Sequence, residues 1–243
     1  MIALGLLILA AVLLLGGTFL RRRYPAAFRP IEAYERLNRA VGLAVESGTR
    51  LHISLGRGNL FTTRGASALA ALAMLRKLSE RTSLSDRPPV VTSGDASLAI
   101  LSQDTLQAGY RAAAAEDQYR YSTGRLTGLT PFSYAAGTVP VTRDENVSTN
   151  VFLGDFGPES ALLTESAERE NSTLIAASDN ISAQSVFYAS SQDPLIGEEL
   201  FAAGAYVGAG AAHEASLTVQ DVLRWLVILA ILIGSLLKFV GAI

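Results

Sequence analysis

Cysteine is absent from the 243 residues of this chain. Disulfide bonds, thiolate metal sites and a cysteine nucleophile are therefore excluded. The chain has only two histidines, His52 and His213, far apart in the sequence and without a carboxylate at the spacing of a metal site or a catalytic triad. We expect His52 to be a packed or surface residue of a strand. The sequence thus predicts no metal site and no catalytic residue.

Signatures of common nucleotide and hydrolase sites are also missing. The segment Gly56-Arg57-Gly58 lacks the third glycine of a dinucleotide fingerprint, no Gly-Lys-Ser/Thr triplet forms a P-loop, and no Gly-x-Ser-x-Gly elbow is present. Acidic residues are plentiful, but nothing selects a catalytic pair. The sequence therefore leaves open whether the chain is an enzyme, favours that it is not, and identifies no cofactor.

A basic cluster is missing outside the flank of the first hydrophobic segment. Without the basic residues that flank or lie in the terminal hydrophobic segments, and without Asp221, the chain has 15 Lys and Arg against 21 Asp and Glu, a net charge of −6. Nucleic-acid-binding proteins usually carry the opposite charge, gathered on one face. We therefore expect no nucleic-acid partner.

Long hydrophobic segments are present at both ends and account for much of the 49% hydrophobic content. Residues 2–20 form an apolar run that would span about 28 Å as a helix, close to the thickness of the hydrocarbon core of a bilayer. A signal peptide is the alternative. It would have basic residues before the apolar run and a cleavage site after it, whereas here the basic residues come after the run and no good cleavage site follows. Residues 222–243 form the second segment. We expect a cell-membrane protein with two transmembrane helices, both of which contact the lipid bilayer.

The orientation follows from Arg21, Arg22 and Arg23, which come directly after the first segment. Lys and Arg are retained on the cytoplasmic side, so residues 24–212 are expected to form a cytoplasmic domain. Lys238, on the far side, opposes this assignment but is outnumbered, and its amine can reach the nearby surface by snorkelling. A functional intramembrane charge is the alternative.

Three further residues of the second segment have an expected place in the membrane. Trp225 suits the membrane interface, where an indole is half wet. Ala230 and Gly234 form a small-xxx-small pair that permits close helix packing, either against the first helix or in a homo-oligomer.

Residues 24–212 alternate short apolar strands with helices, which is typical of an α/β domain with a mostly parallel, doubly wound (Rossmann-like) sheet. We expect strands at 51–55, 90–92, 150–153, 174–177 and 185–189, and helices at 31–46, 64–81, 95–115, 158–168 and 193–206. Residues 116–149 are hard to assign; our expectations there are a strand at 118–122, a short helix at 131–136 and a turn at 146–149. The strand order is not predictable.

Four polar loops, 56–59, 93–95, 154–157 and 178–180, follow expected strands and precede expected helices. In an open parallel sheet, ligands bind at the carboxyl ends of the strands, where helix N-termini can face an anion. Asp95, Asp155 and Asp179 serve equally well as helix caps, so ordinary capping is the alternative. The predicted ligand-binding residues are Gly56, Gly58, Asn59, Ser93, Gly94, Asp95, Gly154, Asp155, Ser178, Asp179 and Asn180.

Residues 154–178 and the segment Asp193-Pro194-Leu195-Ile196-Gly197-Glu198-Glu199 resemble an uncharacterised family of bacterial membrane proteins, known only as a domain of unknown function. The resemblance implies a membrane protein. Because that family has no assigned activity, no catalytic residue follows from it.

Our leading hypothesis is an integral membrane protein whose cytoplasmic domain is a non-enzymatic binding, sensing or scaffolding module, in a possible homo-oligomer. The first alternative is a membrane-tethered enzyme acting on a nucleotide or a phosphorylated small molecule at the carboxyl ends of the strands. The second is an accessory subunit of a larger membrane complex.

Overall fold

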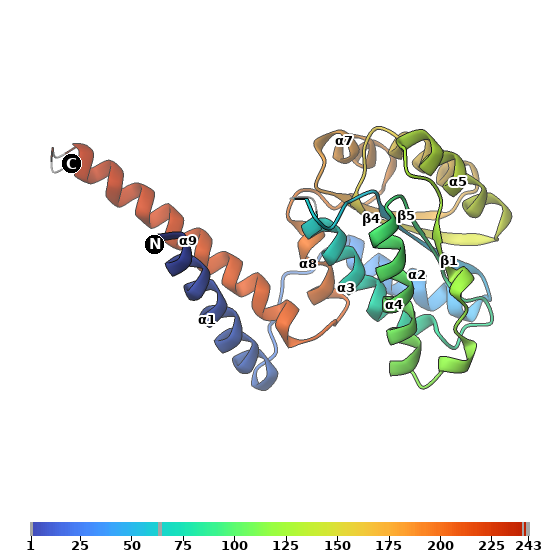
Figure 1. The fold of residues 1–243 in the computed structure, drawn as a ribbon, viewed down its shortest axis with the longest axis horizontal. Helices are drawn as coiled ribbons and strands as arrows, with labels where there is room; N and C mark the ends of the chain where they lie inside the picture. The colour runs from blue at the N-terminus through green and yellow to red at the C-terminus, as the bar shows by residue number, and fades with distance from the viewer. Residues whose placement is uncertain (1, 63–64, 240, 242–243) are drawn as a thin grey trace. The chain divides into compact units, whose positions relative to one another are not determined.

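The computed structural model describes residues 2–62, 65–239 and 241 (Figure 1). The chain divides into two compact units. One is formed by Pro30–Ala209 and the other by the terminal segments Met1–Arg29 and Gly210–Ile243.

Residues 30–209 form an α/β unit around a five-stranded, wholly parallel sheet, as predicted. The strand order is β3-β2-β1-β4-β5, so the chain moves outward from β1 to β3 and then returns to the other side of β1. The order therefore reverses between β1 and β4. The strands are β1 (Arg50–Gly56), β2 (Val90–Ser93), β3 (Gly124–Leu126), β4 (Val147–Asp155) and β5 (Thr173–Ser178).

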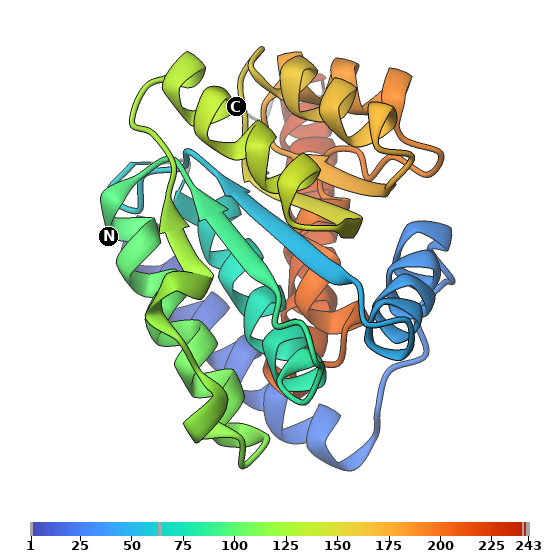
Figure 2. The same cartoon turned by 90° about the vertical axis from the view of Figure 1, so that its right-hand side faces the viewer.

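Helices cover both faces of the sheet (Figure 2). On one face lie α2 (Glu32–Glu46), α3 (Gly65–Thr82), α4 (Ala96–Ala112) and α8 (Glu199–Tyr206). On the other lie α5 (Pro131–Asp144), α6 (Ser160–Arg169) and α7 (Ile181–Ser190). Two short 3₁₀ turns, η1 (Glu116–Gln118) and η2 (Tyr121–Thr123), precede β3.

The two faces of the sheet have different chemistry, because successive side chains of a strand point to opposite sides. Leu51, Ile53 and Leu55 of β1 join the apolar cluster under α2, α3, α4 and α8. Between them, His52 and Ser54 are fully buried toward the α5 side. The α5 side thus combines an aromatic core around Phe152 with buried polar groups.

Several element predictions in the α/β unit are wrong. The segment 185–189 lies in α7, because Asn180 caps that helix by accepting a hydrogen bond from Ser182 N–H at 3.0 Å. This cap starts a helix that overrides the β-propensity of the residues downstream. The helix predicted at 193–206 begins only at Glu199, since Leu195 N–H donates instead to the Ala176 carbonyl at the edge of β5.

The middle region also differs from the prediction. The strand expected at 118–122 is replaced by the two 3₁₀ turns, and β3 follows them. The turn expected at 146–149 is confined to Asn146, which has φ +56°, and β4 starts directly after it. The expected short helix extends to Asp144 through Pro140. Arg64, the expected start of α3, lies outside the described residues.

The terminal unit consists of α1 (Ile2–Arg23) and α9 (Ala211–Phe239), which pack against each other. A Cβ built on Gly17 would lie 3.3 Å from the Cβ of Ala215, and Arg21 donates a hydrogen bond to the Thr218 hydroxyl at 2.9 Å. Both helices are long and apolar enough to cross a membrane, and the most apolar stretch of each is unburied. Residues 240, 242 and 243 of the predicted second span lie outside the described part of the chain.

The residues predicted for the membrane flanks lie at the surface of this unit. Arg22 and Arg23 share the last turn of α1 with Arg21, while Trp225 and Lys238 are exposed along α9. Ala230 is also exposed, and a Cβ on Gly234 would have no atom within 4 Å. Close packing at these two small residues stays a prediction.

Candidate functional site

The four predicted loops meet at the carboxyl edge of the sheet. Across the reversal of strand order, Arg57 N–H donates to the Asp155 carbonyl at 2.7 Å. Gly94 N–H donates to the Gly56 carbonyl at 2.9 Å, and Phe156 N–H donates to Ser178 Oγ at 3.2 Å. The structure therefore brings the ends of β1, β2, β4 and β5 together, which is where an open parallel sheet holds a ligand.

Two of the predicted glycines are needed where the backbones of β1 and β4 approach closely. Gly56 has φ +70°, and a Cβ there would lie 2.2 Å from the Asp155 carbonyl oxygen. Gly154 has φ +144°, and its Cβ would lie 2.1 Å from the Leu55 carbonyl oxygen. Both glycines therefore have a structural reason that involves no ligand.

The polar side chains of the loops cap the helices that follow. Asp95 Oδ1 accepts hydrogen bonds from the backbone N–H of Ser97 at 2.9 Å and of Leu98 at 3.1 Å. Its Oδ2 accepts from the Asn59 amide at 3.1 Å. Burial raises the pKa of Asp95, but these hydrogen bonds outweigh it, so that the pKa lies below its usual range. Asp95 is thus an ionised cap of α4.

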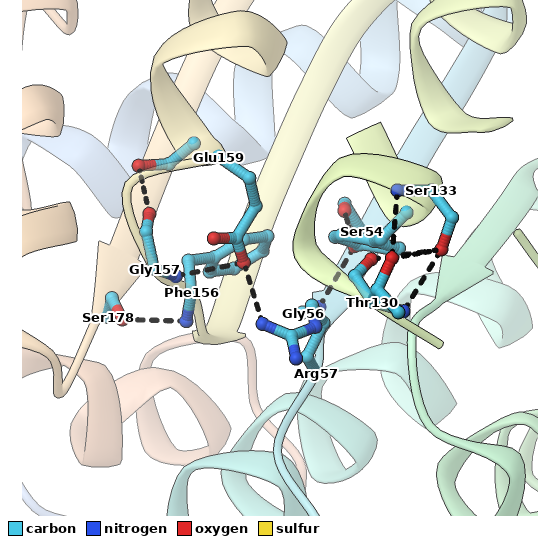
Figure 3. Close-up of polar contacts among 11 residues, drawn as sticks. Ser54, Gly56, Arg57, Thr130, Ser133, Phe156, Gly157, Glu159 and Ser178 are labelled. Atoms are coloured by element: carbon cyan, nitrogen blue, oxygen red, sulfur yellow. Dashed lines mark hydrogen bonds and ion pairs between the residues drawn. The ribbon is translucent and has the colours of Figure 1, made fainter. Parts of the chain in front are cut away.

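Ser178 and Tyr134 satisfy further backbone donors at this edge. Figure 3 shows Ser178 beside Phe156, whose N–H donates to the Ser178 hydroxyl. Ser178 Oγ also accepts from Asn180 N–H at 3.2 Å. The Tyr134 hydroxyl accepts from Gly56 N–H at 3.2 Å and is hydrogen-bonded to the Ser54 hydroxyl. Burial raises the pKa of Tyr134 to about 12, so the phenol is neutral.

An ion pair joins the loops that follow β1 and β4. Figure 3 shows Arg57 reaching toward Glu159, with Nη1 3.5 Å from Oε1, and Gly157 N–H donates to the same carboxylate oxygen at 3.0 Å. The Glu159 side chain is 1% exposed and that of Arg57 28%. Glu159 Oε2 has no hydrogen-bond partner among the described residues.

The described part of this edge has an excess of negative charge. The segments 56–59, 93–95, 127–130, 154–159 and 178–180 contain one basic residue, Arg57, and four acidic ones, Asp95, Asp155, Glu159 and Asp179. A phosphate approaching these loops would meet like charge. Among the described residues, no cluster of three or more His, Asp or Glu could hold a metal ion.

A chain of buried hydrogen bonds crosses the sheet below this edge. His52 Nε2 lies 2.9 Å from Thr92 Oγ1, and His52 Nδ1 lies 2.7 Å from Asn150 Oδ1. Asn150 Nδ2 then donates to Ser172 Oγ at 2.7 Å. Burial lowers the pKa of His52 to about 4, so the imidazole is neutral. This confirms His52 as a packed residue and links three strands to the loop before β5.

A groove of about 1160 Å³ lies beside β5, at the Ser172 end of this series of hydrogen bonds. Helix α2 forms one wall, α6 and α7 form the other, and the starts of β4 and β5 form the floor. No predicted site residue lines it. Its polar and charged lining is Arg36, Arg39, Ser47, Ser148, Thr149, Thr164, Glu168, Asn171, Ser172, Thr173, Ser185, Ser190 and Gln192.

Sequence reasoning missed three features of these sites. Tyr134 lies in the region 116–149, which has no clear pattern of strands and helices, and Glu159 follows Pro158 in a sequence typical of an ordinary helix start. The groove is formed by segments more than a hundred residues apart in the chain, from Arg36 to Gln192. A turn motif carries no signal for such long-range placement.

Comparison with known proteins adds a family but no activity. No curated protein and no solved structure matches this chain. One family profile matches residues 1–243. The chain belongs to this family, which is described as a domain of unknown function (DUF6754).

Proposed function

We propose that this protein is anchored in the membrane by α1 and α9 and that its α/β domain is a cytoplasmic module that binds, senses or scaffolds without catalysing a reaction. The observation that carries the proposal is the state of the carboxyl edge. Its backbone donors at Gly56, Arg57, Phe156 and Asn180 already have acceptors within the chain. A site preorganised for a phosphate would keep such donors available.

Membrane anchoring is supported by two unburied apolar helices, the first of which ends in three arginines. If α1 were a signal peptide and were cleaved off, α9 would lose the contacts that Gly17 and Arg21 of α1 make with it. Fractionation of cells that express the full chain tests this part. We expect the protein in the pellet after alkaline washing and in solution only with detergent; recovery in the supernatant without detergent would contradict it.

The cytoplasmic side follows from Arg21, Arg22 and Arg23 by the positive-inside rule. Protease added to intact cells should leave the domain uncut, and permeabilised cells should lose it. Digestion in intact cells would place the domain on the outside.

One observation favours a tethered enzyme instead. Glu159 Oε2 is buried without a hydrogen-bond partner in the described chain, and Arg57 lies beside the same carboxylate. Buried carboxylates beside a basic side chain occur in catalytic sites as well as in structural ion pairs.

A thermal-shift screen of the full-length protein in detergent separates the two functions. We expect ATP, GTP, NAD and phosphate to leave the melting temperature unchanged. Stabilisation by a nucleotide that disappears in Asp95→Ala and Asp179→Ala would support the enzyme. The comparison uses the shift that the nucleotide causes in each variant, because loss of the Asp95 cap itself costs about 1–2 kcal/mol.

A further inference from the structure

The edge strand β5 is only partly covered. The bridge between Ala177 and Leu195 and the hydrogen bond from Leu195 N–H to the Ala176 carbonyl at 3.2 Å cover its carboxyl half. At its amino half, the Leu174 carbonyl accepts a side-chain hydroxyl, that of Ser191, at 3.2 Å, and no other donor of the described residues. The backbone carbonyls of Leu174 and Ala176 both point away from β4, because backbone groups two residues apart in a strand point to the same side.

The groove beside β5 opens at this amino half, since Thr173 and Leu174 form part of its floor. Its volume of about 1160 Å³ exceeds the roughly 300–1,000 Å³ of typical small-molecule pockets. The walls, α2 on one side and α6 with α7 on the other, stand on either side of the starts of β4 and β5. This geometry is that of a slot for an extended chain.

The walls offer partners for a peptide backbone and for its side chains. Hydroxyl and amide groups such as those of Ser148, Ser190 and Gln192 can pair with N–H and C=O groups, while Leu43, Val186 and Ala189 offer apolar contacts. A strand in the slot would place alternate side chains against opposite walls.

Charge indicates which peptide fits. On the α2 wall, Arg39 is exposed and has no hydrogen bond or ion pair with any described residue. Arg36 nearby pairs with Asp193 at 2.7 Å, and its Nε lacks a hydrogen-bond partner in the described chain. The opposite wall contributes one acidic residue, Glu168. The α2 wall therefore favours an acidic side chain.

We propose that the groove binds an extended peptide segment of a partner protein, which adds a strand to the amino half of β5 and places an acidic side chain against Arg36 and Arg39. The peptide backbone replaces the Ser191 hydroxyl at the Leu174 carbonyl. The inference rests on the proposed function, for which it names the site and the partner class.

A peptide-display selection against the full-length protein in nanodiscs tests the proposal, with a randomised library of peptides of about eight residues, the length of an ordinary strand. We expect enriched peptides that contain Asp or Glu. Methylation of alternate backbone nitrogens of an enriched peptide should weaken binding at least about tenfold, which corresponds to one or two lost hydrogen bonds. A library without enrichment, or an enriched peptide insensitive to methylation, would overturn the proposal.

Two tryptophan variants on α7 locate the binding site. Ala189→Trp fills the groove from an exposed wall position and should weaken binding at least about tenfold. Ile181→Trp is the matched control, since Ile181 is 79% exposed on the same helix and does not line the groove. Equal binding by both variants would overturn the site.

A third variant tests the charge. Arg39→Glu should weaken acidic peptides most, and unchanged affinity would contradict the proposed orientation. Failure of these peptide tests leaves the proposed function standing, whereas nucleotide stabilisation through Asp95 and Asp179 would count against that function itself.

Discussion

His52 Nδ1 lies 2.7 Å from Asn150 Oδ1 in the buried layer between the sheet and α5. The amide nitrogen of Asn150 donates to Ser172, so its oxygen is the acceptor toward His52, and Thr142 donates to the same oxygen at 3.2 Å. His52 therefore carries its proton on Nδ1 and accepts from Thr92 at Nε2. All members of the chain are satisfied with a neutral imidazole, and a second proton would be buried without a counter-charge in direct contact.

This arrangement predicts a stability that falls with pH below the unfolded pKa of histidine. The folded pKa of His52 is about 4 against 6.5 for the free side chain, so the unfolded state binds one more proton between these values. The stabilisation is complete above pH 6.5 and is lost as the pH falls toward 4, by about 3 kcal/mol in total. Urea unfolding of the full chain in detergent from pH 4 to 7 measures it.

The control for this prediction is His52→Gln, which removes the titration but keeps a polar side chain. The variant should be less stable at pH 7 and should have a shallower slope between pH 4 and 6.5. Equal slopes in the two proteins would show that other groups cause the pH dependence.

Tyr134→Phe should destabilise the domain, because it removes the acceptor of the buried Gly56 N–H and the partner of the Ser54 hydroxyl. The expected loss is about 1–3 kcal/mol, the cost of leaving buried polar groups unsatisfied. Thermal or urea unfolding measures it. Tyr188→Phe on α7 is the control, since Tyr188 is 72% exposed, and it should be neutral.

Gly56→Ala should destabilise strongly, because the new Cβ would lie 2.2 Å from the Asp155 carbonyl oxygen and the residue has φ +70°. Gly48→Ala separates the two causes, since Gly48 has φ +64° but open space around its Cβ. The control should cost about 1–2 kcal/mol, the penalty of the left-handed conformation. Equal losses in the two variants would show that β1 and β4 can separate at little cost.

The sequence predicts those strands and helices of the domain that a local hydrophobic pattern determines. Apolar strands such as 51–55 and 174–177 were found because their hydrophobic residues cluster within a few positions. The β-propensity of the segment 185–189 predicts a strand, but the cap at Asn180, five residues upstream, starts a helix that runs through it. Local pattern alone does not decide between two such signals.

Of the two candidate sites, the sequence predicts the loops at the carboxyl edge but not the groove beside β5. The loops at the carboxyl edge follow from a general rule on parallel sheets. Their internal use does not, since Tyr134 meets Gly56 across 78 residues of sequence. The groove depends on the strand order, which leaves β5 at an edge of the sheet. It also depends on the packing of α2 and α7 on opposite sides of that edge. Neither has a local signature.

Arg57 and Glu159 should show coupled effects on stability. Arg57→Ala leaves the buried Glu159 carboxylate with the Gly157 N–H as its one partner among the described residues. The loss should be about 1–3 kcal/mol, less than for a fully buried pair because Arg57 is partly exposed. Glu159→Gln in the Arg57→Ala background should recover part of the loss. Urea unfolding of the four proteins completes the double-mutant cycle, and additive effects would show that the pair contributes nothing.

The absence of cysteine allows a direct test of the contact between α1 and α9, because introduced thiols meet no native one. Gly17→Cys with Ala215→Cys places two Cβ atoms about 3.3 Å apart, near the range of a disulfide. Oxidation in isolated membranes should join the helices within one chain, so that fragments cut in the domain stay linked until reduced. Gly16→Cys with Ala215→Cys is the matched control, since a Cβ at Gly16 has no atom within 4 Å. A crosslinked dimer in place of the internal link would show that this helix contact forms between two copies of the chain.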